Sequence, residues 1–458
     1  MSKKLDCSFR DPSGFLFRKD TVLYRQINHS YKENYDYSKN TGLYNELIEH
    51  GLLIPYEEVA VSCLDSDGFI VIKPVELPLI TYPYEWSFSQ LKEAALLTLN
   101  IQQKALSRGL SLKDASSYNV QLYKGKPIFI DTLSFEKLSP GKPWIAYKQF
   151  CQHFLAPLAL MAKTDISLNQ LFKTNIDGIP LQLASKLLPL TTILNFSLAI
   201  HIHLHARTQS KIAAKEIDPI RLKGSFSIKS FHALIDSLKT AVLKLKWEPV
   251  GTEWHNYYDS NNNYTDASMS FKIDTVIEFL GMLSFRTVWD LGANNGTFSI
   301  LAAKNCDYVC AWDIDPACVE QNYRTVVDSK TTNIYPLLLD LTNPSPAIGW
   351  NNKERSSFKD RGPVDVTLAL GLIHHLVISN NLPLEMIAQF LSEITSTLII
   401  EFVPKSDSQV KKLLKNRNDI FNNYNINNFE LIFSQYFKTL KKRQIDNTDR
   451  TLYLMQIL

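Results

Sequence analysis

Residues 287–296 read Thr287-Val-Trp-Asp-Leu-Gly-Ala-Asn-Asn-Gly296 and decide the fold of the C-terminal part of the chain. A short run of strand-forming residues leads directly into a loop with glycines at 292 and 296, after which a helical pattern begins. Glycines let the backbone approach a ligand closely, and the first amides of a helix are unpaired. The stretch therefore predicts a strand, a ligand-binding turn and a helix, as in doubly wound sheets.

Strand-like and helix-like segments alternate from Ala267 onward, which indicates repeated β-α-β units and a parallel sheet. Pro316 suits the first turn of the helix that follows the second strand. The two last apolar runs flank a turn at 446–449 and predict a closing hairpin that adds an antiparallel edge. The predicted fold class is α/β with a Rossmann-like, seven-stranded sheet, whose strands are 287–291, 308–312, 334–338, 364–370, 397–402, 437–445 and 451–458.

Acidic residues end or follow the first three predicted strands. Asp290 lies at the end of the first strand, Asp313 ends the second about 20 residues further on, and Asp340 follows the third. Asp290 is placed to hold a cationic amino-acid group directly or through water. Asp313 is placed to accept hydrogen bonds from ribose hydroxyls, and Asp340 to face the exocyclic amine of adenine.

This arrangement resembles class I S-adenosylmethionine-dependent methyltransferases, over the part of the chain from about Trp254 to Leu458. The resemblance implies S-adenosylmethionine as the cofactor. A nicotinamide-binding domain is the nearest alternative, but Asn294 takes the place of the middle glycine in the Gly-x-Gly-x-x-Gly spacing that a pyrophosphate needs. The cofactor-binding candidates are the loop residues and the three acids: Asp290, Gly292, Asn294, Gly296, Asp313 and Asp340.

Methyl transfer is an in-line displacement at a sulfonium carbon, so positioning and desolvation supply much of the catalysis. If a base assists, His374 and His375 at the exit of the fourth strand are the catalytic candidates, because histidine takes a proton near neutral pH. The alternative is that one histidine packs and the other bonds the backbone. Glu401 ends the fifth strand and is a candidate for orienting the acceptor, with a surface carboxylate as the alternative.

The segment after the fourth predicted strand excludes two classes of methyl acceptor. The segment Gly371-Leu-Ile-His374 stands where enzymes that methylate amino groups of bases carry Asn/Asp-Pro-Pro-aromatic, and it has no Pro-Cys nucleophile. A small molecule or a protein side chain is the expected acceptor. Aromatic residues just before the domain are expected to wall an acceptor pocket or to pack in a lid helix: Trp254, Tyr257, Tyr258 and Tyr264.

The N-terminal half contains a second pattern. Asp114 and Asn119 have the Asp-x-x-x-x-Asn spacing of a kinase catalytic loop, and Asp131 follows like a metal-binding aspartate. This half resembles the protein-kinase and small-molecule-kinase fold, with Arg25 in place of the phosphate-pairing lysine and Glu46 as its helix partner. The resemblance implies ATP and magnesium, held by Asn119 and Asp131, while Asp114 orients a hydroxyl. The alternative is an α+β domain in which Asp114 caps a turn.

The composition limits the number of domains, the class of partner and the presence of a metal site. The chain has 458 residues, 45% hydrophobic and 21% charged, which indicates a soluble globular protein with two domains, expected at 1–250 (α+β) and 251–458 (methyltransferase). A net charge of +3 argues against nucleic acid as a partner. The six cysteines lack zinc-ligand spacing, so no metal site is expected there.

No signal peptide is expected, and this indicates a cytoplasmic protein. Residues 187–206 carry no Asp, Glu, Lys or Arg and are long enough to cross a bilayer, but Pro189 and the histidines at 201, 203 and 205 favour a buried helix.

The sequence thus predicts a methyltransferase whose N-terminal half selects the acceptor. The alternatives are a bifunctional protein with an ATP-dependent kinase-like activity in its N-terminal half, and a non-catalytic adaptor.

Overall fold

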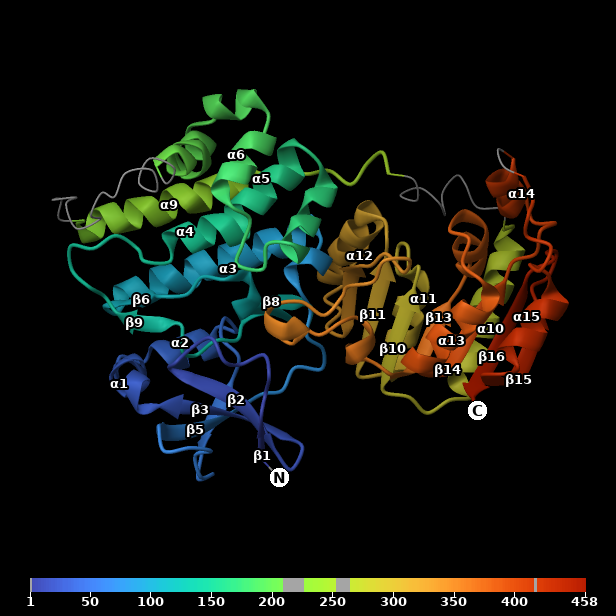
Figure 1. Ribbon diagram of the computed structural model, residues 1–458, viewed down its shortest axis with the longest axis horizontal. Helices are drawn as coiled ribbons and strands as arrows, with labels where there is room; N and C mark the ends of the chain where they lie inside the picture. The colour runs from blue at the N-terminus through green and yellow to red at the C-terminus, as the bar shows by residue number, and fades with distance from the viewer. Residues whose placement is uncertain (1, 209–225, 253–263, 416–417) are drawn as a thin grey trace. The chain divides into compact units, whose positions relative to one another are not determined.

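The computed structural model describes residues 2–208, 226–252, 264–415 and 418–458 (Figure 1). The chain divides into two compact units, Met1–Trp247 with Ile348–Arg355, and Glu248–Ala347 with Ser356–Leu458. The division after Trp247 lies close to the predicted boundary. Residues 348–355 lie between two strands of the C-terminal unit in the chain but belong to the N-terminal unit, and no sequence pattern predicted this.

One seven-stranded sheet organises the C-terminal unit, in the order β12-β11-β10-β13-β14-β16-β15. The first five strands along the chain are parallel, and β16 runs antiparallel to both β14 and β15. The predicted Rossmann-like seven-stranded sheet with a closing hairpin is confirmed. The strands are β10 (Thr287–Leu291), β11 (Tyr308–Asp313), β12 (Ile334–Leu338), β13 (Val364–Ala369), β14 (Thr395–Phe402), β15 (Phe437–Gln444) and β16 (Thr451–Ile457).

The parallel strands are apolar because helices cover both faces of such a sheet. Every residue of β11 and β12 is buried, and Trp289 packs edge-to-face on Trp312 with ring centroids 6.1 Å apart. Helix α12 starts where predicted, since Pro316 occupies its first turn and the Asp315 side chain caps it. The helices are α10 (Asp266–Gly281), α11 (Thr297–Ala302), α12 (Pro316–Asp328), α13 (Leu384–Ile394), α14 (Ser408–Leu414) and α15 (Ile426–Phe433).

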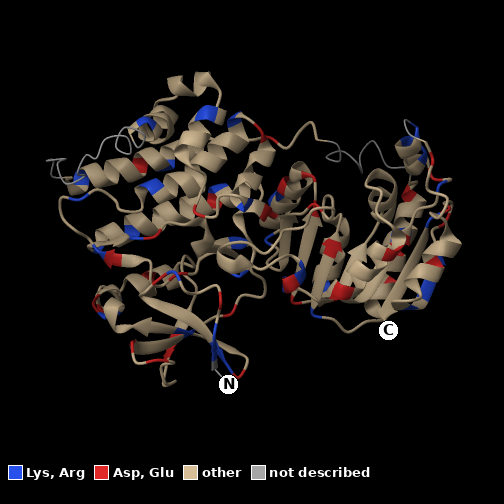
Figure 2. Ribbon diagram, viewed as in Figure 1, with Lys and Arg blue, Asp and Glu red and all other residues tan. Residues whose placement is uncertain are grey.

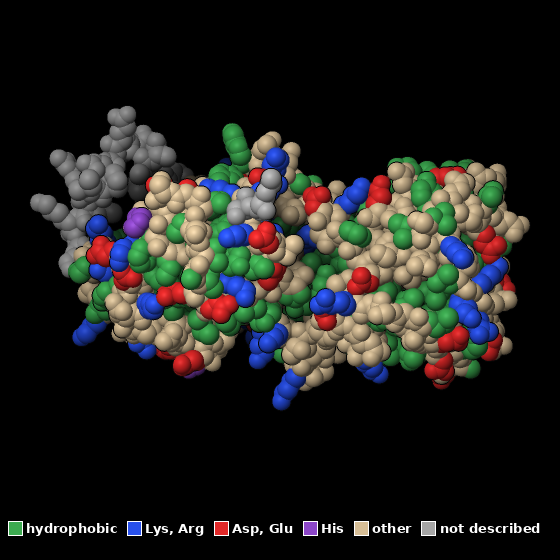
Figure 3. Space-filling model, turned by 90° about the horizontal axis from the view of Figure 1, so that it is seen from below, with side chains coloured by type: hydrophobic (Ala, Val, Ile, Leu, Met, Phe, Trp, Pro, Cys, Tyr) green, Lys and Arg blue, Asp and Glu red, His purple; other side chains and the backbone are tan. Residues whose placement is uncertain are grey.

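The edge strand β15 is exposed after its first residue and carries four basic side chains, Lys438, Lys441, Lys442 and Arg443 (Figure 2). Charged residues on an edge strand discourage pairing with another chain. On the face seen in Figure 3, basic and acidic side chains are interspersed, and no basic stripe is visible.

The N-terminal unit begins with a five-stranded antiparallel sheet in the order β1-β2-β3-β5-β4, and α1 and α2 lie between β3 and β4 in the chain. Two short strand pairs follow the long helix α3, which starts with a Ser87–Gln90 capping box. The predicted α+β class is confirmed. The elements are β1 (Ser2–Lys4), β2 (Gly14–Lys19), β3 (Val22–Asn28), α1 (Lys32–Asn40), α2 (Leu43–Glu49), β4 (Tyr56–Val59), β5 (Gly68–Pro74), α3 (Phe88–Ser107), β6 (Leu110–Leu112), β7 (Val120–Tyr123), β8 (Lys126–Phe129) and β9 (Phe135–Lys137).

The rest of the N-terminal unit is helical. Its α-helices are α4 (Tyr147–Phe150), α5 (Ala156–Lys163), α6 (Leu181–Leu187), α7 (Phe196–Leu198) and α9 (Ile228–Lys244), and shorter 3₁₀ and π turns connect several of them.

The prediction of one buried helix over residues 187–206 is wrong. Pro189 and Asn195 break the segment into short helical turns, and Leu190, Leu194 and Phe196 are 76 to 88% exposed. His201 and His203 are buried, and each ring bonds two side-chain hydroxyls. Within the described ranges, no helix has the length and apolarity needed to cross a membrane.

Candidate functional site

A cavity of about 300 Å³ lies at the carboxyl ends of the parallel strands of the C-terminal unit. Strand β10 has β11 on one side and β13 on the other, so the chain direction across the sheet reverses there, and ligands bind at such switch points. Five of the nine site residues predicted for the C-terminal unit line this cavity. They are Gly292 and Asn294 after β10, Asp313 at the end of β11, Asp340 after β12, and His375 after β13.

The turn after β10 has the conformation that its sequence requires. Gly292, Asn294 and Gly296 have φ values of 75, 49 and 83°, which lie in the left-handed region. A Cβ on Gly296 would lie 2.6 Å from the Asn322 side chain, so only glycine fits there. The amides of Gly292 and Ala293 both donate to the Trp312 carbonyl, at 2.8 and 2.9 Å, and hold the turn against β11.

Asp313 is the best-positioned acceptor in the cavity wall. Its carboxylate accepts hydrogen bonds from the backbone amides of Asn294 at 2.7 Å and Asp315 at 2.8 Å. Burial raises the pKa of Asp313 to about 6, and the nearby Asp315 carboxylate acts in the same direction against the two amides. The carboxylate is therefore oriented by neutral donors and still lines the cavity, as a residue that binds ribose hydroxyls would be.

The other two acids differ from each other in exposure. Asp290 is buried, accepts a 2.6 Å hydrogen bond from the Ser299 hydroxyl of α11, and does not line the cavity. Burial raises the pKa of Asp290 to about 7. Asp340 lines the cavity, and its Oδ1 accepts from the amide and hydroxyl of Thr342 at 2.8 and 2.7 Å. Asp340 is thus placed to meet a ligand, and Asp290 supports the turn from behind.

The structure separates the two histidines after β13. His375 lines the cavity, whereas His374 is buried behind it, and the two ring centroids are 4.1 Å apart. Burial, with the positive charge of Arg450, lowers the pKa of His375 to about 4. Burial and His375 hold the pKa of His374 well below its usual value. Both rings are therefore neutral near pH 7, and only His375 faces the cavity.

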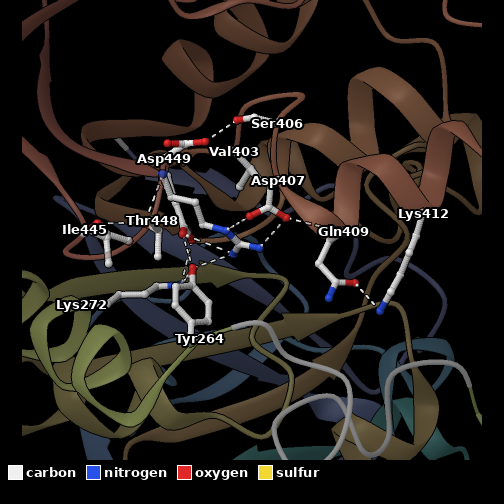
Figure 4. Close-up of polar contacts among 12 residues, drawn as sticks. Tyr264, Lys272, Val403, Ser406, Asp407, Gln409, Lys412, Ile445, Thr448 and Asp449 are labelled. Carbon is white, nitrogen blue, oxygen red and sulfur yellow. Dashed lines mark hydrogen bonds and ion pairs between the residues drawn. The ribbon is translucent and has the colours of Figure 1, made fainter.

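Glu401 belongs to a buried ionic network (Figure 4). Its Oε2 lies 2.8 Å from Lys272 Nζ of α10, and its Oε1 accepts from the Tyr264 hydroxyl. Arg450 donates to that same hydroxyl at 2.6 Å and forms a two-bond pair with Asp407 at 2.7 and 3.1 Å. A surface location for Glu401 is therefore wrong, because the side chain is fully buried.

The network forms one wall of the cavity. Tyr264, Lys272 and Arg450 line the cavity, and the carboxylates of Glu401 and Asp407 lie behind them. Burial would raise the pKa of Glu401, but Lys272 and Arg450 together hold it below its usual value. Tyr264 was predicted to wall an acceptor pocket or to pack in a lid helix, and it lines the cavity, whereas Lys272, Asp407 and Arg450 were not predicted. The other aromatic candidates, Trp254, Tyr257 and Tyr258, lie outside the described residues.

Comparison with known proteins adds a relative that spans both units. The chain is 35% identical to nodulation protein NoeA of Rhizobium meliloti (strain 1021), over 98% of this chain and 95% of that protein. The chain belongs to the NoeA family. No family model matches it.

Among solved structures, the N-methyltransferase NodS of Bradyrhizobium japonicum WM9 with S-adenosyl-L-homocysteine is 10% identical, with a TM-score of 0.33 over 46% of this chain and 94% of NodS. Magnesium protoporphyrin IX methyltransferase of Synechocystis PCC 6803 is 18% identical, with a TM-score of 0.32 over 44% of this chain and 91% of that enzyme. The strand order and the turn after β10 give the C-terminal unit the class I methyltransferase fold.

The kinase-like candidates in the N-terminal unit are brought together only in part. Arg25 of β3 lies 2.5 Å from Asp131, and Asn119 donates to the Ser134 hydroxyl at 3.2 Å, which in turn donates to Asp131. Asp114 accepts from the Ser116 amide at 2.9 Å. The predicted pairing of Glu46 with Arg25 is wrong.

Glu46 instead pairs with two cations near the end of α3, Lys104 at 2.6 Å and Arg108 at 2.7 Å. These residues do not fit magnesium and ATP, because the carboxylate that would hold the metal is bound by a guanidinium. Over the described ranges, no cluster of three or more His, Cys, Asp or Glu side chains is placed to hold a metal ion.

Replacing Glu401 with alanine should lower the free energy of unfolding by about 3 to 5 kcal/mol, because it leaves Lys272 buried without its carboxylate. Urea unfolding measures the change. The control is Glu393→Ala, which breaks an exposed pair with Lys359 and should cost about 1 kcal/mol or less. Equal losses in the two variants would show that the buried pair stabilises the fold no more than the exposed pair does.

Affinity for S-adenosylhomocysteine should fall as the pH is lowered through about 6, where Asp313 becomes protonated and stops accepting two hydrogen bonds from a ligand. Below its pKa the loss approaches about tenfold per pH unit if only the ionised form binds. Calorimetric titration between pH 5 and pH 8 measures it. The same slope in Asp313→Asn would assign the effect to another group, such as Asp290.

Proposed function

We propose that this protein transfers the methyl group of S-adenosylmethionine to a small molecule or a protein side chain. The observation that carries the proposal is the Asp313 carboxylate, which two backbone amides orient in the wall of the cavity. Asp313 would bind the ribose hydroxyls and Asp340 the adenine amine. Gly292 and Asn294 would line the path of the methionine part, while Gly296 keeps the turn in its shape.

When bound, the cofactor supplies a methyl group on a sulfonium, and an acceptor atom takes it by in-line displacement as the sulfur–carbon bond breaks. His375 is the group in the cavity wall that would take the acceptor proton, since its ring is neutral at pH 7. His374 supports the His375 ring from behind. Glu401 is a positioning residue, because both its oxygens are engaged by Tyr264 and Lys272.

The acceptor side of the cavity is mainly apolar with few polar groups. Three leucines after β13 and one of α14 line it, together with the polar groups of Ser379 and Asn380. This mixture suits a small organic molecule or a side chain that the apolar wall desolvates. Its leucines are Leu370, Leu372, Leu376 and Leu413.

We further propose that the N-terminal unit selects the acceptor. The match to NoeA runs through both units, which supports a joint function for the two halves. The same relationship supports a role in nodulation. The cysteines of the described chain are free, three of them buried, which supports a reducing, cytoplasmic location.

Titration calorimetry of the full chain with S-adenosylmethionine and with S-adenosylhomocysteine tests the proposed function. Both should bind, and Asp313→Asn should weaken both by about tenfold or more, since it removes charge-assisted hydrogen bonds. Asp307→Asn is the matched control, because Asp307 is exposed and pairs with Arg286 just before the start of β11. Absence of binding by the folded wild-type chain would overturn the proposal.

The role of His375 is tested by turnover. With an acceptor found by screening candidates against labelled S-adenosylmethionine, His375→Ala should slow turnover by about 10²- to 10⁴-fold. Its affinity for S-adenosylhomocysteine should stay within about twofold of the wild type. A parallel loss of affinity and turnover would make His375 a packing residue.

A further inference from the structure

Two carboxylates of the N-terminal unit, those of Asp114 and Asp131, are connected through Asn119, which hydrogen-bonds Asp114 and the Ser134 hydroxyl that donates to Asp131. Asp114 follows β6 and Asp131 follows β8, and the charge of Asp131 raises the pKa of Asp114, after the larger effect of burial. The Asp131 side chain is 13% exposed. Two clustered acids in a largely buried position need positive charge nearby, because uncompensated charge in such a position is costly.

Polar groups surround Asp131. The Ser134 hydroxyl and the Leu133 amide donate to it, and Asn119 reaches the same hydroxyl. Carboxylate, amide and hydroxyl oxygens are the ligands of hard divalent cations such as Mg²⁺ and Mn²⁺. By ligand chemistry alone, a cation would be the expected counter-charge here.

The counter-charge is instead a side chain of the chain itself. Arg25 lies on the central strand β3, where it pairs with Leu16 of β2 and Ile72 of β5, so its backbone is fixed on both sides. Its guanidinium nitrogen lies 2.5 Å from Asp131 Oδ1, and the arginine is as little exposed as the aspartate. Burial would raise the pKa of Asp131, but Arg25 holds it below the usual value.

Arginine is well suited to this position. Its guanidinium stays charged at every pH the protein meets, and its planar donors match a carboxylate. A lysine at this position would be a compact, hydrated point charge that leaves more of the carboxylate to a metal. The arginine therefore neutralises Asp131 at every concentration of divalent cation.

We infer that Arg25 is a built-in counter-ion that replaces a divalent cation at Asp131, so that the N-terminal unit binds no metal–nucleotide complex, and that a neutral residue at position 25 uncovers a divalent-cation site. The inference concerns the N-terminal unit alone and does not rest on methyl transfer. It assigns to this unit an aspartate that the Arg25 guanidinium neutralises in place of a metal ion.

Mn²⁺ titration of the full chain, followed by the electron paramagnetic resonance signal of free Mn²⁺, tests the inference. The wild type should bind no Mn²⁺ that depends on Asp131, and Arg25→Met should bind one further equivalent. Arg25→Met/Asp131→Asn, which removes both charges, should return to the wild-type level. The matched control is Arg18→Met, because Arg18 lies on the neighbouring strand β2 and pairs with the exposed Glu76.

The outcomes are distinct. Wild-type Mn²⁺ binding that Asp131→Asn abolishes would overturn the inference, as would a folded Arg25→Met variant that binds no more Mn²⁺ than Arg18→Met. If Arg25→Met does not fold, the wild type decides the question by a thermal shift assay with ATP and Mg²⁺. An unchanged unfolding temperature supports the inference. A rise in the unfolding temperature that needs both ATP and Mg²⁺ contradicts it.

Discussion

The turn after β10 depends on one carbonyl group, that of Trp312, which accepts the amides of Gly292 and Ala293. This pair of hydrogen bonds joins the ends of β10 and β11, so the turn cannot move independently of the neighbouring strand. The turn has left-handed backbone at three positions, two of which are glycine. In this turn the amide of Asn294 donates to Asp313. The backbone conformation of the turn therefore orients the carboxylate that lines the cavity.

The wall formed by Tyr264, Lys272 and Arg450 depends on contacts between side chains. Tyr264 and Lys272 belong to the start of the C-terminal unit, whereas Glu401 ends β14 and Arg450 precedes β16. Buried ionic groups are expensive to desolvate, and they stabilise a fold only when the partners are all in place. Here the contacts join distant parts of the chain at one point of the cavity. The network therefore fixes the shape of the wall more than it adds to the stability of the unit.

The sequence predicted the elements whose signal is local. The strands and the closing hairpin were predicted from alternating patterns, and Asp313 and Asp340 were chosen for their places at strand ends. The network was missed because its partners lie far apart in the chain, up to 186 residues for Arg450 and Tyr264, and no spacing rule connects them.

Glu46 was paired wrongly for a related reason. A helix position shows which face of α2 carries the acid, but it cannot show that the end of α3 supplies two nearer cations.

A buried aspartate has different partners in the two units, backbone amides for Asp313 and a guanidinium for Asp131. This difference separates the Asp313 cavity from the Asp131 position as a place for a ligand. Asp313 is held by neutral amides, so its charge is oriented but not cancelled, and the cost of its burial appears as a raised pKa. Asp131 is held by a guanidinium, so its charge is cancelled inside the protein and its pKa is lowered. An uncancelled carboxylate in a cavity wall gains from a ligand that donates hydrogen bonds. A neutralised carboxylate gains little from a ligand, so the same residue type is open to a ligand in the cavity of one unit and is paired within the chain in the other.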